Sequence, residues 1–135
     1  MDRSHARALA ERWATEAVAA GRVAVFDELV SADAVDHSCP TAARGVDGFK
    51  LRTRAVHAAF TEVQVVVEDL LVDGDMIAWR WTLTATHSGP FAGVAATGRR
   101  ATMTGMNIQR VESGRVVEHW SNVDQLGLLR QVQAP

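Results

Sequence analysis

The stretch VESGRVVEHWSNVDQLGLLRQ, residues 111–131, decides most of what can be said about the fold. Ser113-Gly114 separates two strand-like runs, and such a pair is typical of a tight hairpin turn. After Asn122 the apolar spacing becomes helical. We therefore predict a hairpin formed by residues 99–111 and 115–122, followed by a short helix over residues 125–131.

The segments before this stretch divide into a helical part and a β part. Apolar spacing predicts helices over residues 4–20, 22–29 and 45–60, with Ser4 capping the first. Residues 30–37 are expected to be extended, and Pro40 to end that segment. A second hairpin joins residues 63–72 and 76–87 through Asp73-Gly74, and a glycine-rich loop over residues 88–98 could shape a pocket mouth. Helices followed by strands predict an α+β fold.

Composition limits the classes of function. The chain has 135 residues, a length that suits a single domain over residues 1–135. Its formal net charge is −2, and the charges are scattered, which argues against a nucleic-acid partner. The single cysteine, Cys39, allows no internal disulfide. With no signal peptide or membrane-spanning run in the sequence, we expect a cytoplasmic protein that does not bind membranes.

The turn at Ser113-Gly114 also predicts which side chains share a face of the sheet. If Glu112 pairs with Arg115, Asn107 lies opposite Trp120. One face then carries Met103, Asn107, Gln109, Trp120, Asn122 and Asp124, and the other carries Thr102, Thr104, Met106, Ile108, Val117, His119 and Ser121. We expect the first face to line a ligand pocket and the second to be covered by another subunit. A one-residue bulge would exchange the two faces.

Residues 111–131 resemble the C-terminal signature of the SnoaL-like polyketide cyclases, in the nuclear-transport-factor-2-like superfamily. The pattern dGkI-x-E-x-W-x-x-x-D-x-L-G-L-L-x-Q is filled by Gly114, Val116, Glu118, Trp120, Asp124, Leu126, Gly127, Leu128, Leu129 and Gln131. Two upstream pieces are also similar to the family: AVDHSCP at residues 34–40, and THSGPFAGVAATGR at residues 86–99. The likeness extends over nearly the whole chain.

The resemblance implies a cone of three helices wrapped by a curved antiparallel sheet, with a short C-terminal helix and one deep pocket. It implies a homodimer, here through the outer face of the sheet. It also implies that Asp124 is the general acid/base of an intramolecular aldol ring closure, without cofactor or metal. The sequence departs from the family at Ala95-Ala96, where relatives carry two prolines, and it contains no tyrosine.

Asp124 and His37 are the catalytic candidates. A carboxyl group in an apolar pocket can remove a proton next to a carbonyl and return one to the developing alkoxide. The alternative is that Asp124 only caps the last helix, because it directly precedes Gln125. His37 could relay a proton or donate to a carbonyl, or could be a structural histidine bonded to the backbone.

The other candidates are expected to contact the substrate. Asn107 and Gln109 could hold a carbonyl or a phenol, or satisfy each other across the strands. His119 is expected on the far face, in an interface or at the surface, and Trp79 and Trp81 are expected in the core. The predicted binding residues are Trp120, Asn107, His87, Asn122, Met103, Phe49, Phe60 and Gln109. No HxH or HExxH spacing occurs, so we expect no metal site.

The leading hypothesis is a cofactor-independent cyclase or isomerase acting on a small, hydrophobic, polyketide-like carbonyl compound. One rival is a non-catalytic protein that binds an apolar metabolite in the same pocket. A second rival is an epoxide hydrolase, which would need an Asp–Arg–Asp arrangement that Asp124 with Arg110 or Arg80 does not obviously supply.

Overall fold

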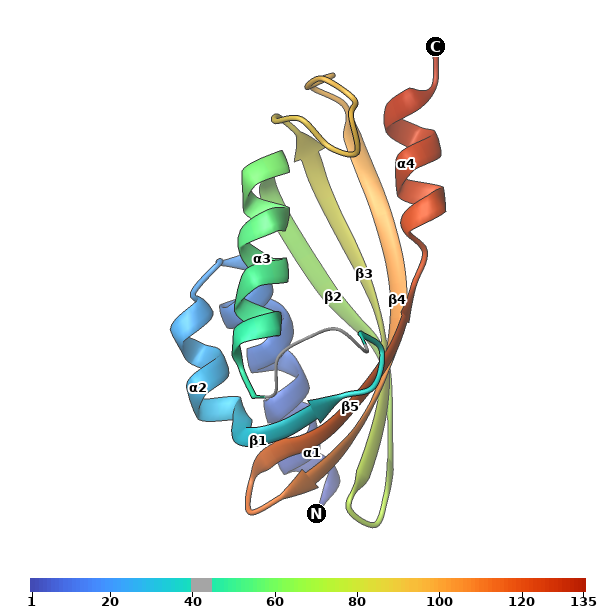
Figure 1. The fold of residues 1–135 in the computed structure, drawn as a ribbon. Coiled ribbons are helices and arrows are strands. Elements are labelled where there is room, and N and C mark those ends of the chain that lie inside the picture. The colour runs from blue at the N-terminus through green and yellow to red at the C-terminus, as the bar shows by residue number, and fades with distance from the viewer. Residues whose placement is uncertain (40–44) are drawn as a thin grey trace.

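The computed structural model describes residues 1–39 and 45–135, so Pro40 lies outside the described residues. The elements in chain order are α1 (Arg3–Glu11), the π-helical η1 (Arg12–Ala19), the 3-10 turn η2 (Val23–Val25), α2 (Phe26–Leu29), β1 (Val30–Asp36), α3 (Asp47–Ala59), β2 (Phe60–Asp73), β3 (Met76–His87), β4 (Arg100–Glu112), β5 (Arg115–Val123) and α4 (Gln125–Gln133). Figure 1 shows α1, α2 and α3 on one side of a curved sheet, with α4 beside β4 at the end far from the N-terminus.

The sheet is mixed, with the strand order β1-β5-β4-β3-β2. The pairs β2–β3, β3–β4 and β4–β5 are antiparallel, whereas β1 runs parallel to β5 at one edge. The predicted α+β class and the short C-terminal helix are confirmed. The sheet is not purely antiparallel, because the segment predicted only as extended pairs with β5 and adds a parallel edge strand.

The element ends differ from the predicted ones in two instructive places. Asp2, not Ser4, caps the first helix, since its Oδ1 accepts a hydrogen bond from the His5 backbone N–H at 2.9 Å. Asp73 pairs with Met76, so the first hairpin turns at Gly74-Asp75, one residue later than predicted. In both cases the end of a helix or strand differs from the predicted one by a residue or two. The ends of elements are the positions that sequence patterns define least well.

The register between β4 and β5 contains a bulge that decides the site. Glu112 pairs with Arg115 as predicted, and both turn residues, Ser113 and Gly114, have positive φ angles of 50° and 77°. Val111 then pairs with Val116 but Arg110 pairs with Glu118, so Val117 has no partner of its own.

The bulge makes the predicted face assignment for β5 wrong. Beyond it, Gln109 pairs with His119 and Asn107 with Ser121, so His119 and Ser121 lie on the same face as the two amides. Trp120 and Asn122 pair with Ile108 and Met106 on the opposite face.

Two clusters of buried side chains form the core. The first packs α1, η1, α2 and α3 against the sheet and includes Trp13, whose ring meets those of Phe26 and Phe49 edge-on at centroid distances of 5.0 Å. The second lies at the other end, where Leu128 and Val132 of α4 pack with residues of β3 and β4. None of the helices in the described part of the chain is long and apolar enough to cross a membrane.

Candidate functional site

A cavity of about 150 Å³ lies between the helices and the inner face of the sheet. The helical side supplies mainly apolar and aromatic residues, among them Trp13, Val18, Phe26, Phe49 and Val56, together with Arg52 and Thr53. The sheet supplies Val65, Trp79, Trp81, Leu83, Met103, Asn107, His119, Ser121 and Val123. An apolar wall with a few polar groups is the usual composition of a small-molecule site.

His119 is the titratable group most closely enclosed by this cavity. Its ring stacks on Trp13 at a centroid distance of 5.4 Å and an angle of 10°, and meets Phe49 edge-on at 5.0 Å. The side chain is 4% exposed. Burial lowers the pKa of His119 to about 4. The negative charge of Asp36 raises this pKa and the positive charge of Arg52 lowers it, but both effects are smaller than that of burial. The imidazole is therefore neutral at neutral pH.

Two amides on β4 are held by two indoles on β3. The Trp79 indole N–H donates to Gln109 Oε1 at 3.0 Å, and the Trp81 indole N–H donates to Asn107 Oδ1 at 3.2 Å. Gln109 Nε2 in turn lies 3.0 Å from Nδ1 of His119. Both amides are buried, so these bonds satisfy polar groups that the fold removes from water.

Asp36 and Arg52 form an ion pair beside the cavity. Asp36 ends β1, pairs with His119 in the sheet register, and binds Arg52 Nη2 through Oδ2, while Oδ1 accepts from the backbone N–H of Ser38 at 3.0 Å. Its side chain is 4% exposed. Burial by itself raises the pKa of the Asp36 carboxyl, but the Ser38 hydroxyl, His119 and Arg52 outweigh it, and the pKa lies below its ordinary value. Asp36 is therefore a buried, ionised counter-charge.

Some predicted binding residues do meet at the cavity. Met103, Asn107 and Phe49 line it directly. Gln109 is fully buried and reaches the cavity only through His119. The amides do not satisfy each other across the strands, since each accepts from its own tryptophan.

Asp124 lies outside this group. Its side chain accepts a hydrogen bond from the Gly127 backbone N–H at 2.8 Å, which caps α4, and the residue is exposed. It is not among the residues that line the cavity. The bulge at Val117 explains the difference, because it shifts the alternation of side chains along β5.

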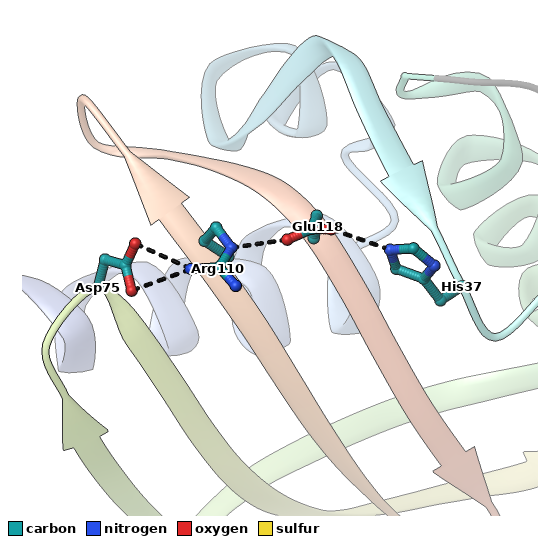
Figure 2. A network of polar contacts seen from close by, with 4 residues as sticks. All are labelled: His37, Asp75, Arg110 and Glu118. Carbon is teal, nitrogen blue, oxygen red and sulfur yellow. Dashed lines mark hydrogen bonds and ion pairs between the residues drawn. The ribbon is translucent and has the colours of Figure 1, made fainter.

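His37 and Trp120 lie together on the outer face of the sheet, where their rings stack at 4.7 Å. Figure 2 shows the polar network that His37 joins there: Nε2 lies 3.2 Å from Glu118 Oε1, Glu118 binds Arg110, and Arg110 binds Asp75. The Arg110 guanidinium, and after it His37, hold the pKa of the Glu118 carboxyl below its ordinary value. The prediction that Trp120 faces the pocket is wrong, and His37 points away from the cavity with it.

Two further predicted contacts, His87 at the glycine-rich loop and Phe60 after the third helix, lie outside the cavity. His87 is fully buried, with Nδ1 2.9 Å from the Thr97 hydroxyl and its ring 5.5 Å from that of Phe60. Phe60 belongs to the second core cluster. Neither residue is among those lining the cavity.

Several cavity residues had no counterpart in the sequence prediction. The predicted site residues do not include Trp13, Phe26 or Arg52, all of which line the cavity. Arg52 follows Phe49 by three positions on α3, and this spacing places the two side chains on the same face of a helix. Such a spacing could have pointed to Arg52, whereas the position of His119 depends on a bulge that the sequence does not mark.

No group of three or more His, Cys, Asp or Glu side chains within residues 1–39 and 45–135 is placed to hold a metal ion.

The class of fold is defined by helices on one side of a curved mixed sheet, with a mostly apolar cavity between the helices and the sheet. Within that class, the family model of the SnoaL-like polyketide cyclases matches residues 8–132. The chain belongs to the SnoaL-like polyketide cyclase family. A comparison of the sequence with curated proteins finds no match.

Solved structures agree with this assignment. TsrD from Streptomyces laurentii is 28% identical with a TM-score of 0.89, and the match covers 100% of this chain and 99% of that one. IdmH from Streptomyces antibioticus, provisionally described as a polyketide cyclase, is 32% identical with a TM-score of 0.81 over 93% of this chain and 96% of its own. AclR from Streptomyces galilaeus, provisionally described as a hydroxylase, is 27% identical with a TM-score of 0.86 over 97% of this chain and 86% of its own. The descriptions of these similar structures thus name different reactions.

Proposed function

We propose that this protein is a cofactor-independent enzyme that closes or isomerises a hydrophobic carbonyl compound, with the cavity around His119 as its active site. The observation that carries the proposal is a buried imidazole, held neutral and set among aromatic rings, at the polar end of an otherwise apolar cavity. Polarisation of a carbonyl by a neutral imidazole is an established catalytic use of this side chain.

The cavity size limits what part of the ligand it holds. A volume of about 150 Å³ accommodates roughly one aromatic ring. We therefore propose that the reacting carbonyl end of a polyketide-like molecule enters the cavity while the rest lies toward the rim. In ring closure, a proton passes from a carbon next to one carbonyl to a water molecule at the rim of the cavity, and the resulting enolate carbon bonds to a second carbonyl carbon. The alkoxide that forms takes a proton back from water, so no proton is gained or lost overall. Hydrogen bonds at the cavity end would stabilise the negative oxygen at both stages.

Catalysis by His119 and catalysis by Asp124 predict different effects of substitution. Exchange of α-protons for deuterium in a bound ketone, followed by NMR, detects enolate formation without knowledge of the natural substrate. We expect the wild-type protein to accelerate this exchange in acetophenone and in short aromatic 1,3-diketones, and His119→Phe to lose about 100-fold or more of the acceleration. Asp124→Asn should retain most of it, because Asp124 caps α4.

Two outcomes of the exchange experiment would count against this assignment. If Asp124→Asn loses the exchange and His119→Phe keeps it, the family's aspartate is the acid/base group and the cavity assignment fails. If the wild-type protein binds the ketones without any exchange, the non-catalytic binding protein is the better description.

We also propose that two copies associate through the outer face of the sheet. That face exposes Val66, Met106 and Ile108, with exposed fractions of 54%, 60% and 47%, and Trp120, which stacks on His37, pairs with Ile108 in the register. Exposed and half-buried apolar side chains that neighbour one another, as Met106, Ile108 and Trp120 do, favour burial against another protein.

A further inference from the structure

The cavity presents oriented N–H groups at its polar end. Of the described residues that line it, none is an aspartate or a glutamate, and its one charged group is the cation of Arg52. On the sheet, the lining residues that carry side-chain nitrogen atoms are Trp79, Trp81, Asn107 and His119, and the two indole N–H groups are already bonded to amide oxygens. Which of their atoms donate and which accept depends on how the ring and the amide are oriented.

The two indoles settle those orientations, because an indole nitrogen can only donate. Trp79 donates to Gln109 Oε1, so the NH₂ group of Gln109 must be the end next to His119. An NH₂ group donates, so Nδ1 of His119 is the acceptor and a neutral ring carries its proton on Nε2. Trp79, through Gln109, therefore selects the tautomer of His119.

The orientation of the Asn107 amide, two residues before Gln109 on β4, is also determined by an indole donor. Trp81 donates to its Oδ1, which leaves the NH₂ group as its other end. That nitrogen has no hydrogen-bond partner among residues 1–39 and 45–135, and the residue is 4% exposed. The pairs Trp79–Gln109 and Trp81–Asn107 repeat because both tryptophans and both amides alternate on the inner faces of β3 and β4.

We propose that Trp79 and Trp81 are positioning residues that fix His119 Nε2–H and the Asn107 NH₂ group as a pair of hydrogen-bond donors, and that the cavity selects ligands presenting an unprotonated oxygen, such as a ketone, enolate or phenolate, over amines. This deepens the proposed function and rests on the same cavity. The donors come from neutral groups. The Arg52 guanidinium lines the cavity, whereas its partner Asp36 is not among the lining residues, so the charge that faces a ligand is positive and favours an oxyanion over an ammonium group.

The tautomer can be measured without any ligand. Long-range ¹H–¹⁵N NMR on histidine-labelled protein at pH 7 should show His119 with an unprotonated Nδ1 and a protonated Nε2. A proton on Nδ1 in the wild-type protein would overturn the inference, because Gln109 would then be reversed and Trp79 would not orient it.

Gln109→Glu tests the relay with nearly the same shape. A carboxylate accepts from Trp79 and also from His119, so the ring should change to the tautomer protonated on Nδ1 or become doubly protonated. Gln133→Glu adds the same charge at an exposed position of α4 and should leave the His119 spectrum unchanged. Trp79→Phe serves if Gln109→Glu does not fold, and should give a mixture of tautomers. An unaltered His119 tautomer in a folded Gln109→Glu protein would contradict the relay.

Ligand choice is tested with two molecules of nearly equal shape, acetophenone and 1-phenylethylamine. Wild-type protein should bind acetophenone about tenfold or more tightly than the amine, and Asn107→Asp or Gln109→Glu should reduce that preference. Equal binding of the two molecules by the wild-type protein would overturn the selection of oxygen acceptors.

These readouts separate this inference from the proposed function. If the tautomer and the ligand preference are as predicted but no α-proton exchange occurs, the donor pair is supported and the proposed enzymatic function is contradicted. If Gln109→Glu still catalyses the exchange and its His119 tautomer is unaltered, the enzymatic function is supported and the donor pair is contradicted.

Discussion

At the scale of single residues, His119 links the site to the stability of the fold. Folding lowers its pKa from about 6.5 to about 4, so the unfolded chain binds the proton at a pH where the folded chain does not. Stability is therefore full above pH 6.5 and is lost as the pH falls toward 4, by up to about 3 kcal/mol. Urea unfolding at pH 7 and pH 4.5 should show this loss in the wild-type protein and much less of it in His119→Phe.

The control for the pH experiment is His37→Gln, a change on the exposed outer face. It should keep the wild-type pH dependence, because the charged neighbours of His119, namely Asp36 and Arg52, are unaltered. A similar acid loss in His119→Phe and in wild type would mean that another group controls the transition.

Gly105 is a second residue whose identity the cavity requires. A Cβ atom there would lie 2.3 Å from Cζ2 of the Trp81 ring, so Gly105→Ala must displace the indole that holds Asn107. We expect a loss of about 1–3 kcal/mol in the free energy of unfolding and a shifted Trp81 indole resonance. Thr104→Ala, at the exposed neighbouring position, should cost much less; equal costs for the two variants would contradict the packing explanation.

At the scale of elements, Asp124 belongs to the start of α4. Asp124→Ala removes the cap bond to the Gly127 N–H and should lower the free energy of unfolding by about 1 kcal/mol. Asp124→Ser, which keeps a capping oxygen, should restore most of it. A Ser variant as unstable as the Ala variant would show that the carboxylate acts through something other than the cap.

The elements also show how far sequence reasoning reaches. Hydrophobic period and turn residues predicted β3 to the residue and the pairing of Glu112 with Arg115, because these signals are local. They missed the bulge at Val117, since no residue type there is distinctive and the extra residue is set by packing across the whole sheet. The one extra residue of the bulge exchanges the faces on which Trp120 and His119 lie. The strands could therefore be predicted from the sequence, whereas the residues that β5 contributes to the site could not.

At the scale of the whole molecule, the outer face of the sheet exposes a group of large apolar side chains. Ile108→Lys places a charge at its centre, next to Trp120 in the register, and should convert a dimer to a monomer in sedimentation velocity. Leu51→Lys, at an exposed position of α3 on the other side of the sheet, is the matched control and should leave the dimer intact. A monomeric wild-type protein would contradict the proposed association.

Ligand binding in the cavity lined by His119 can be observed directly through the tryptophan side chains. Of the four in the chain, Trp13, Trp79 and Trp81 line the cavity and Trp120 lies on the outer face. The decisive measurement is a titration with acetophenone followed by the four indole N–H resonances in a ¹H–¹⁵N spectrum. We predict saturable shifts for the three cavity indoles, largest for Trp81, and little change for Trp120. A shift of Trp120 alone would place the ligand on the outer face and contradict the assignment of the site.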